Sequence, residues 1–205
     1  LPKPQKKPLR NSVMLSQSGA FMITRLSQNP WLDPAYMLAL GNQTDLTHGD
    51  MLGYFAALPG IETLGIYIEG FKDLDGLAFA KAVRKAVLNG KQIVVYKSGR
   101  TAPGQGGVMG HTASIAGGLT LFESVVRHAG AIVAEDFNSF DDLFYIAGVL
   151  QDKKIGGRRI GAISGAGFEA VGMADNIESD SFALEMGALE DATVKKVEEI
   201  LVAKK

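Results

Sequence analysis

Apolar and polar positions along the chain form two alternating patterns. Short, nearly continuous apolar runs alternate with longer segments in which apolar residues recur every three or four positions. The continuous runs are typical of strands buried on both faces of a sheet, and the periodic segments are typical of amphipathic helices. The runs predict strands at residues 12–15, 35–40, 63–68, 93–97, 131–134 and 159–164.

Three of the periodic segments begin at residues suited to a helix start. Thr47 and Asp50 have the spacing of a capping box, in which each side chain caps the backbone N–H of the other residue. Asp75 opens a helix that should stop at Gly90, and Ser139 opens another. Strands and helices therefore alternate, which predicts an α/β fold: a doubly wound parallel sheet of about five strands with helices on both faces.

The chain divides at a polar, glycine-bearing stretch after Leu150. A sheet of about five strands is complete by that residue, and another strand and helix begin beyond it. We therefore expect a basic linker at residues 1–11, a first α/β domain at residues 12–150 and the start of a second, similar unit at residues 151–205. The second unit has room for little more than a strand, a helix and the amphipathic segment 192–205, so we expect it to be truncated.

Composition limits the kinds of partner. Hydrophobic residues make up 46% of the 205 residues and the formal net charge is −1, which gives no sign of nucleic-acid or membrane binding. No apolar run approaches the roughly 20 residues of a membrane span. The chain has no cysteine, which excludes disulfides and thiolate chemistry and favours a cytoplasmic location. His48, Asp45 and Asp50 have no recognisable metal-site spacing, so we expect no metal centre.

Two segments have the form of an apolar strand that runs into a glycine turn and a helix: VMLSQSGA at 13–20 and IGAISGAGF at 160–168. Such an elbow leaves free N–H groups at a helix N-terminus, where the helix dipole favours an anion by about 0.3–1 kcal/mol. Alternatively, glycine is simply needed for a tight turn. The candidate phosphate-binding residues are Gln17, Ser18 and Gly19 in the first elbow, and Ser164, Gly165 and Gly167 in the second.

Neither elbow is a P-loop, because the terminal GK[ST] is missing. Residues 165–170, GAGFEA, match the short dinucleotide-binding pattern, and Glu185 lies at a suitable distance for a ribose contact. That pattern is short, and the chain has 25 glycines, so it recurs easily by chance. A dinucleotide-binding domain built on residues 159–205 remains the weaker alternative.

The segment 106–118, GGVMGHTASIAGG, places His111 between glycine pairs. Histidine is the side chain that titrates near neutral pH. Between residues 76 and 122 there is no acidic residue, whereas six lysines and arginines occur there. Lys97 and Arg100 stand at the end of a predicted strand, where an anionic substrate would dock. We interpret His111 as a candidate catalytic residue in an electropositive setting.

Glu69 ends a predicted strand just before Gly70, at the sheet edge where active-site groups of parallel sheets collect. A carboxylate commonly orients a reacting imidazole and stabilises its charged form. Glu69 is therefore the second catalytic candidate, beside the alternative of a solvated charge at a strand end. His128 lies on a predicted amphipathic helix, and we interpret it as structural.

Five motifs in a fixed order resemble the phosphohistidine domain of the nucleoside-diphosphate-forming acyl-CoA synthetases, which include the ADP-forming acetate–CoA ligases and are relatives of succinyl-CoA ligase. The resemblance covers residues 12–150, and residues 164–175, SGAGFEAVGMAD, are similar to the start of the second flavodoxin-like ligase domain of these enzymes. The five motifs are SQSGA at 16–20, LGN at 40–42, YIEG at 67–70, YKSGRT at 96–101 and GHTASIAGG at 110–118.

The resemblance implies a flavodoxin-like fold and a role in the reaction acid + CoA + ATP ⇌ acyl-CoA + ADP + phosphate. It implies that His111 takes a phosphoryl group from an enzyme-bound acyl phosphate and passes it to ADP or GDP. Glu69 would support the phosphohistidine, and the two elbow helices would stabilise the phosphate from opposite sides.

The same resemblance implies that the chain works with a CoA-binding domain and an ATP-grasp domain or subunit, in an oligomer. CoA, ATP or ADP and Mg²⁺ would be substrates of the complete enzyme, and no cofactor would be tightly bound. The chain departs from the family pattern at Ala113, where glycine is usual, and at Phe168 and Glu169, which are bulkier and more acidic than expected beside a phosphate. The principal alternative is therefore a non-catalytic regulatory module of the same fold that binds an anion or a CoA ester.

Overall fold

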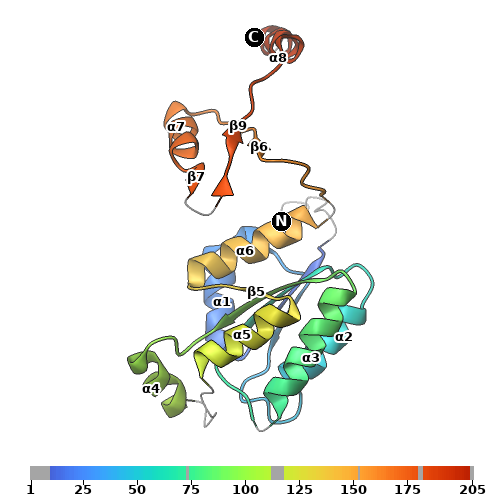
Figure 1. Ribbon diagram of the computed structural model, residues 1–205, viewed down its shortest axis with the longest axis vertical. Coiled ribbons are helices and arrows are strands. Elements are labelled where there is room, and N and C mark those ends of the chain that lie inside the picture. Colours follow the sequence, from blue (N-terminus) through green and yellow to red (C-terminus); the bar gives the residue numbers. More distant parts are fainter. Residues whose placement is uncertain (1–9, 73, 112–117, 152, 180–181, 204–205) are drawn as a thin grey trace, which may run out of the picture. The chain divides into compact units, whose positions relative to one another are not determined.

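The computed structural model describes residues 10–72, 74–111, 118–151, 153–179 and 182–203. The chain forms two compact units, Leu1–Lys153 and Lys154–Lys205 (Figure 1). Most of the basic segment expected at residues 1–11 lies outside the described residues.

The first unit contains a five-stranded sheet in which all pairings are parallel. The strand order is β2-β1-β3-β4-β5. Strand β2 is added on one side of β1, and β3, β4 and β5 are added on the other side, so the strand order reverses between β1 and β3. This order is that of flavodoxin-like folds, and it confirms the fold predicted from the sequence. The strands are β1 (Ser12–Ser16), β2 (Tyr36–Ala39), β3 (Thr63–Ile68), β4 (Gln92–Lys97) and β5 (Ile132–Val133).

Helices cover both faces of the sheet (Figure 1). Residues of α2, α3 and α5 pack with one set of strand side chains, and residues of α1 and α6 pack with the other set. The helices of this unit are α1 (Gly19–Gln28), the short 3₁₀ helix η1 (Pro30–Leu32), α2 (His48–Ala57), α3 (Asp75–Leu88), α4 (Ala102–His111), α5 (Leu119–Ala129) and α6 (Phe137–Leu150).

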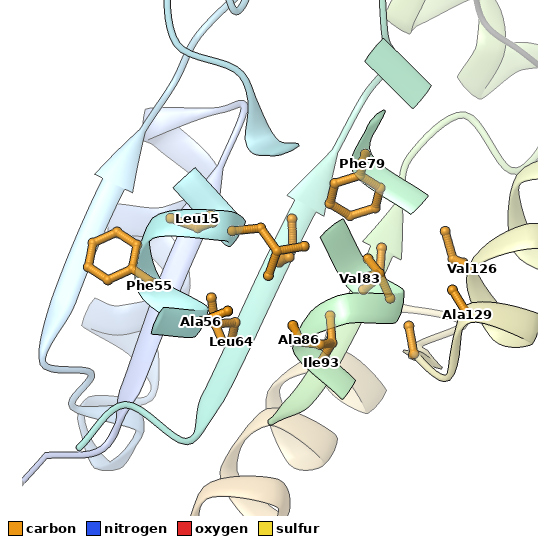
Figure 2. Close-up of a cluster of buried hydrophobic side chains, with 14 of the residues drawn as sticks. Leu15, Phe55, Ala56, Leu64, Phe79, Val83, Ala86, Ile93, Val126 and Ala129 are labelled. Atoms are coloured by element: carbon orange, nitrogen blue, oxygen red, sulfur yellow. The ribbon is translucent and has the colours of Figure 1, made fainter. Parts of the chain in front are cut away.

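Side chains along each strand point alternately to the two faces of the sheet and so belong to two separate hydrophobic cores. Leu15 of β1 points into the cluster formed with α2, α3 and α5, where Phe79 and Val83 are fully buried (Figure 2). Its neighbour Met14 belongs to the opposite cluster, with α1 and α6. Successive strand side chains point to opposite faces, so a strand covered on both faces is apolar throughout. This explains the continuous apolar runs of the sequence.

Glycine at position 65 allows α6 to approach the sheet. A Cβ atom built on Gly65 would lie 2.7 Å from Cδ2 of Phe144, which is far closer than carbon atoms approach. Phe144 is itself 1% exposed and stacks with Phe140. The absence of a side chain at Gly65 therefore makes room for the aromatic ring of α6.

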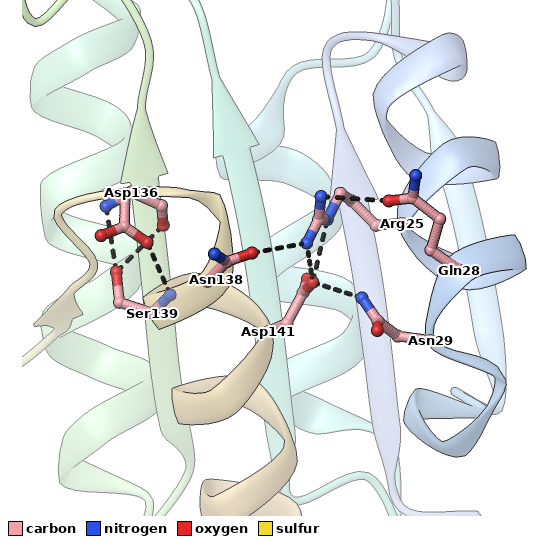
Figure 3. A network of polar contacts seen from close by, with 7 residues as sticks. All are labelled: Arg25, Gln28, Asn29, Asp136, Asn138, Ser139 and Asp141. Atoms are coloured by element: carbon pink, nitrogen blue, oxygen red, sulfur yellow. Dashed lines mark hydrogen bonds and ion pairs between the residues drawn. The ribbon is translucent and has the colours of Figure 1, made fainter.

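A polar network ties α1 to α6 (Figure 3). Arg25 Nε donates to Asp141 Oδ2 at 2.9 Å, a second guanidinium nitrogen pairs with the same oxygen, and Asn29 donates to it at 2.6 Å. Asp141 is 4% exposed, and its burial raises the pKa of this carboxyl, while Arg25 and Asn29 partly offset the rise. The network fixes the helix that follows the first elbow.

The helix starts confirm two predictions and correct a third. Thr47 and Asp50 form the predicted capping box at the start of α2, and α3 begins at Asp75. The prediction that Ser139 opens its helix is wrong, because α6 begins at Phe137 with Asp136 as its N-cap. The Asp136 carboxylate accepts from Ser139 N at 2.8 Å, and the Ser139 hydroxyl accepts from Asp136 N at 3.0 Å (Figure 3).

The second unit has little regular structure. β6 (Arg159–Ile160) pairs in parallel with β9 (Glu185–Met186), and β7 (Glu178–Ser179) pairs antiparallel with β8 (Phe182–Ala183). The strand predicted at residues 159–164 is therefore only two residues long. Two helices complete the unit, α7 (Gly167–Asp175) and α8 (Asp191–Ala203). Among the described residues of both units, no helix combines the length and the apolar character needed to cross a membrane.

Candidate functional site

The first elbow connects β1 to α1. Ser18 is the N-cap of α1, and its hydroxyl accepts from the backbone N–H of Phe21 at 3.2 Å. The N–H of Ser18 donates to the hydroxyl of Ser16 at 3.1 Å. The N–H groups of Gly19 and Ala20 have no acceptor among the residues that the structure describes. The first turn of α1 thus presents two open donors at the positive end of a helix dipole.

Gln17 has a different role from the one suggested by the elbow pattern. Its side chain is buried, and its Oε1 accepts from the N–H groups of Glu69 and Gly70 at 2.8 and 3.1 Å. Its own N–H donates to the carbonyl of Tyr67 at 3.1 Å. Gln17 therefore links the elbow to the end of β3, and its N–H is already engaged.

Glu69 follows β3 at the same edge and is half-buried. Its Oε1 accepts from the hydroxyl of Tyr67 at 3.2 Å. Burial, followed by smaller contributions that include the Glu69 charge, raises the pKa of Tyr67 to about 12. Tyr67 therefore remains a protonated donor that steadies one oxygen of the carboxylate.

Lys97 lies at the end of β4 and is 2% exposed. Its Nζ donates to the carbonyls of Glu69 and Ser98, at 3.1 and 3.3 Å. Burial lowers the pKa of this amine, and the negative charge of Glu69 opposes the shift. The lysine thus joins the ends of β3 and β4 and places a cation beside the candidate carboxylate.

The expectation that Arg100 offers its charge to an anion is corrected by its partner. Arg100 forms an ion pair with Glu123 of α5, with 2.6 Å between Nη1 and Oε1, and its guanidinium lies 6.0 Å from the Tyr96 ring. Glu123 is the first acidic residue after the acid-free stretch, and the fold returns it to the end of β4. The arginine charge is therefore neutralised locally.

His111 is the last residue of α4. The glycine-rich segment is therefore helical up to this residue, and the side chain of Thr101 accepts from Gly104 N at 3.2 Å. The side chain of His111 and residues 112–117 lie outside the described part of the structure. His128 lies on the exposed side of α5.

Comparisons of the chain with known proteins identify its family. A family model described as the succinyl-CoA ligase like flavodoxin domain matches residues 10–149. The chain belongs to this family. The resemblance drawn from the ordered motifs is thereby confirmed.

ADP-forming acetate–CoA ligases are among the family relatives. That of Methanocaldococcus jannaschii is 32% identical over 190 residues, which cover 92% of this chain and 26% of that protein. The alpha subunit of ADP-forming acetate–CoA ligase II from Pyrococcus furiosus is 28% identical over 193 residues, or 93% of this chain and 40% of the subunit. This chain thus spans less than half the length of either relative.

A solved structure resembles the chain in three dimensions. It is acetyl-coenzyme A synthetase 1 of Ca. Korarchaeum cryptofilum, described as dinucleotide forming and solved in complex with phosphate and ADP. The TM-score is 0.70 at 26% sequence identity, and the match covers 96% of this chain and 42% of that one.

The second elbow, in the second unit, differs from the first in its charge. Ser164 Oγ accepts from Ala166 N at 3.0 Å and also lies within hydrogen-bonding distance of the Glu169 carboxylate. Ala166 is the N-cap of α7, which begins at Gly167, and this N-cap residue provides no side-chain hydrogen bond to the helix. A carboxylate of the chain therefore stands where an anion would approach Ser164, Gly165 and Gly167.

A cavity of about 440 Å³ opens beside Lys97 in the first unit. Apart from this amine and Lys72, its walls are mainly apolar side chains of the start of α3 and of α5, including Leu77, Leu121 and Phe122. Within the described ranges, no group of three or more histidine, aspartate or glutamate residues is placed to hold a metal ion.

The importance of Gln43 and His48 is not apparent from the sequence. Both are buried, at 3% and 0% exposure. Gln43 donates to the carbonyl of Gly70, which follows Glu69 after β3, and His48 hydrogen-bonds to the side chain of Gln43. A glutamine and a histidine five residues apart carry no recognisable pattern. Their importance comes from burial, which the sequence of a polar turn does not reveal.

Proposed function

We propose that this chain is the phosphoryl-carrying part of a nucleoside-diphosphate-forming acyl-CoA synthetase, which catalyses acid + CoA + ATP ⇌ acyl-CoA + ADP + phosphate. Membership of the succinyl-CoA ligase like family supports the proposal, as do relatives named ADP-forming acetate–CoA ligase. The observation that carries it is the contact between two predicted parts of the site: Gln17 of the first elbow hydrogen-bonds directly to the backbone of Glu69.

In this proposal, His111 is the phosphoryl acceptor. A neutral ring nitrogen attacks the phosphorus of an acyl phosphate, an N–P bond forms, and the P–O bond to the acyl group breaks, so that the carboxylate leaves with the electron pair. The other ring nitrogen keeps its proton. Glu69 accepts a hydrogen bond from that N–H and stabilises the positive charge that the ring acquires on phosphorylation. Attack of ADP or GDP on the phosphohistidine then returns the ring to its neutral form.

The first elbow would bind the phosphoryl group. The N–H groups of Gly19 and Ala20 have no acceptor among the described residues, Ser18 caps the helix, and Gln17 anchors the end of β3 beside them. Donors fixed in advance cost no reorganisation when charge develops. The second elbow, at Ser164, would serve the same purpose only if Glu169 turned away, because the two negative charges repel each other.

The remaining substrates would bind to parts of the enzyme with which this chain works. One relative is named a subunit, and another is a single protein of which this chain matches 26%. We therefore propose that a CoA-binding part and an ATP-grasp part supply the CoA and nucleotide sites, with Mg²⁺ entering as a companion of ATP. The chain by itself should not form acyl-CoA from acid, CoA and ATP.

Phosphoryl labelling tests the proposal. The chain is assembled with its CoA-binding and ATP-grasp parts and incubated with ATP labelled at the γ-phosphate, which requires no knowledge of the acyl group. An acid-labile, base-stable label is expected, and His111→Asn should abolish it. A label that persists in this variant, or that never forms in the native enzyme, would exclude the carrier role. Retained phosphate binding without a label would indicate the regulatory module instead.

A further inference from the structure

The peptide that carries Glu69 is held by side chains from three separate parts of the fold. Gln17 Oε1 accepts from the N–H groups of Glu69 and Gly70, Lys97 Nζ donates to the Glu69 carbonyl, and Gln43 Nε2 donates to the Gly70 carbonyl at 3.0 Å. All four backbone polar groups of these two residues therefore have a partner. Such complete anchoring of a short turn after a strand fixes the direction in which its side chain points.

Gln43 is held in an uncommon conformation. It follows β2, its side chain is buried, and its φ is +54°, in the left-handed region that non-glycine residues seldom adopt. Such a conformation costs on the order of 1–3 kcal/mol and persists where the surroundings determine it. Its backbone N–H bonds to Leu40 O at 3.1 Å, and its carbonyl accepts from Lys72 Nζ at 2.9 Å. The strained backbone of Gln43 therefore accompanies a side chain whose amide donates to the Gly70 carbonyl.

His48 fixes which way the Gln43 amide faces. It is the first residue of α2, and both its backbone N–H and its Nδ1 lie at Gln43 Oε1, at 3.0 and 2.7 Å. An amide oxygen only accepts hydrogen bonds, so Nδ1 carries the proton of the ring. Burial lowers the pKa of His48 to about 4, with a smaller opposing effect from the Tyr67 carbonyl. The ring is therefore neutral at pH 7, and it forces the amide nitrogen of Gln43 toward Gly70.

We propose that Gln43 and His48 are positioning residues, which set the orientation of the Glu69 carboxylate through the Gly70 carbonyl. The inference rests on the proposed function, in which Glu69 acts on His111. Among the described residues, neither of the two hydrogen-bonds to the Glu69 carboxylate itself. The hydrogen bonds run in one direction, from His48 Nδ1–H to Gln43 Oε1 and from Gln43 Nε2–H to Gly70 O.

Two substitutions of His48 separate positioning from simple packing. His48→Asn places an amide N–H near the position of Nδ1, so it retains the donor to Gln43. His48→Leu fills a comparable apolar space but removes that donor. Loss of a purely structural histidine should affect both variants alike, whereas loss of positioning should affect only the leucine variant. Gln43→Met removes donor and acceptor at constant length and provides a second test if His48→Leu folds poorly.

The geometric measurement uses the whole 205-residue chain. Backbone amide exchange of Glu69 and Gly70 is followed by NMR at pH 7. We expect exchange at both amides to accelerate by roughly tenfold or more in His48→Leu and Gln43→Met, because a freed turn opens more readily. In His48→Asn the rates should remain within about threefold of native. Unchanged exchange in the leucine and methionine variants would overturn the positioning role.

The functional measurement is the rate of labelling from γ-labelled ATP in the assembled enzyme. We expect His48→Leu and Gln43→Met to slow it roughly 10–100-fold at saturating ATP, with little change in the half-saturating ATP concentration, because misplacement of about 1 Å has effects of this size. In His48→Asn the labelling rate should remain within about threefold of the native rate. Equal rates in all variants, or equal losses in the asparagine and leucine variants, would refute the proposal.

Failure of the proposed function gives a different result. If Glu69→Gln leaves labelling unchanged, the role of Glu69 in the chemistry is wrong. The exchange rates of Glu69 and Gly70 then still decide whether Gln43 and His48 hold this turn, since that measurement involves no phosphoryl transfer.

Discussion

The side-chain oxygen of Gln17 accepts a hydrogen bond from the backbone N–H of Glu69, at 2.8 Å and across 52 positions of sequence. Gln17 follows β1 and Glu69 follows β3, two strands that are neighbours where the strand order reverses. Ligand sites of open parallel sheets lie at such a point. The Gln17 side chain therefore fixes the position of the Glu69 backbone relative to the N-terminus of α1.

Phosphate should bind at the first turn of α1, because the N–H groups of Gly19 and Ala20 have no acceptor in the described part of the chain. Gly19→Pro removes one of these donors at a position where proline suits a helix, and Ser18 already has the extended backbone that a residue before proline requires. We expect phosphate titration of the 205-residue chain to shift the amide signals of Ala20 and Gly19, and Gly19→Pro to weaken the binding severalfold.

The matched control is Gly19→Ala, which keeps the N–H. Its Cβ would lie 3.7 Å from the Cβ of Ala39, an ordinary contact, so its phosphate affinity should be native. Equal affinities in the proline and alanine variants would show that phosphate does not bind through this N–H.

Glu69→Gln should slow labelling of His111 by about 10²–10⁴-fold, the range of a positioned acid–base contribution. Glutamine keeps a hydrogen-bonding group but loses the charge that stabilises a phosphorylated ring. The label should remain on His111, so peptide mapping of the labelled variant is the measurement. A labelling rate within twofold of native would assign Glu69 to the alternative of a solvated charge.

Stability should fall as the pH falls below the unfolded pKa of His48. The folded pKa is about 4 and the ordinary value is 6.5, so the unfolded chain takes up the proton first. The contribution of His48 is fully present above pH 6.5 and is lost between that pH and about 4, by about 3 kcal/mol in total. Urea unfolding between pH 7 and pH 4 measures it.

Carboxylates also titrate in part of this range, so the comparison is with His48→Leu under the same conditions. The difference in unfolding free energy between the native protein and this variant should shrink or reverse by about 3 kcal/mol on acidification. A pH-independent difference would show that His48 does not stay neutral in the folded chain.

Gly65→Ala should destabilise the first unit by about 1–3 kcal/mol, because its Cβ would overlap the ring of Phe144 in a packed core. Gly53→Ala is the control: a Cβ atom at this helical position would meet no atom of the other described residues within 4 Å outside the backbone of its own helix, and alanine should stabilise α2 by about 0.5–1 kcal/mol. Thermal unfolding measures both. Combining Gly65→Ala with Phe144→Leu should recover part of the loss, and the absence of any recovery would contradict this packing explanation.

Arg25→Met should destabilise the first unit by about 3–5 kcal/mol, because it leaves the buried Asp141 without its cation. In Arg25→Met/Asp141→Leu the uncompensated charge is gone, and most of the loss should be regained. Urea unfolding at pH 7 gives both values. If the double variant is no more stable than Arg25→Met, the penalty does not come from the orphaned carboxylate.

Local patterns predicted much of the fold. The runs at 12–15, 63–68 and 93–97 coincide with β1, β3 and β4 to within a residue. They do so because a strand covered on both faces is apolar along most of its length. The capping box of Thr47 and Asp50 was also predicted correctly, since both partners lie within one helical turn. The order of short motifs correctly indicated the family, because a series of motifs is far more specific than any single one.

The sequence alone, then, determined the strands of the first unit and their order along the chain, because these depend on patterns among residues that are near one another, and its ordered motifs indicated the family. The tertiary structure decided the electrostatics and the geometry of the site. Glu123 neutralises Arg100 from 23 positions away, and Gln43 reaches Gly70 from 27 positions away. Parallel strands need long crossovers, so residues distant in the chain meet at the sheet edge, and no local pattern records which of them face each other.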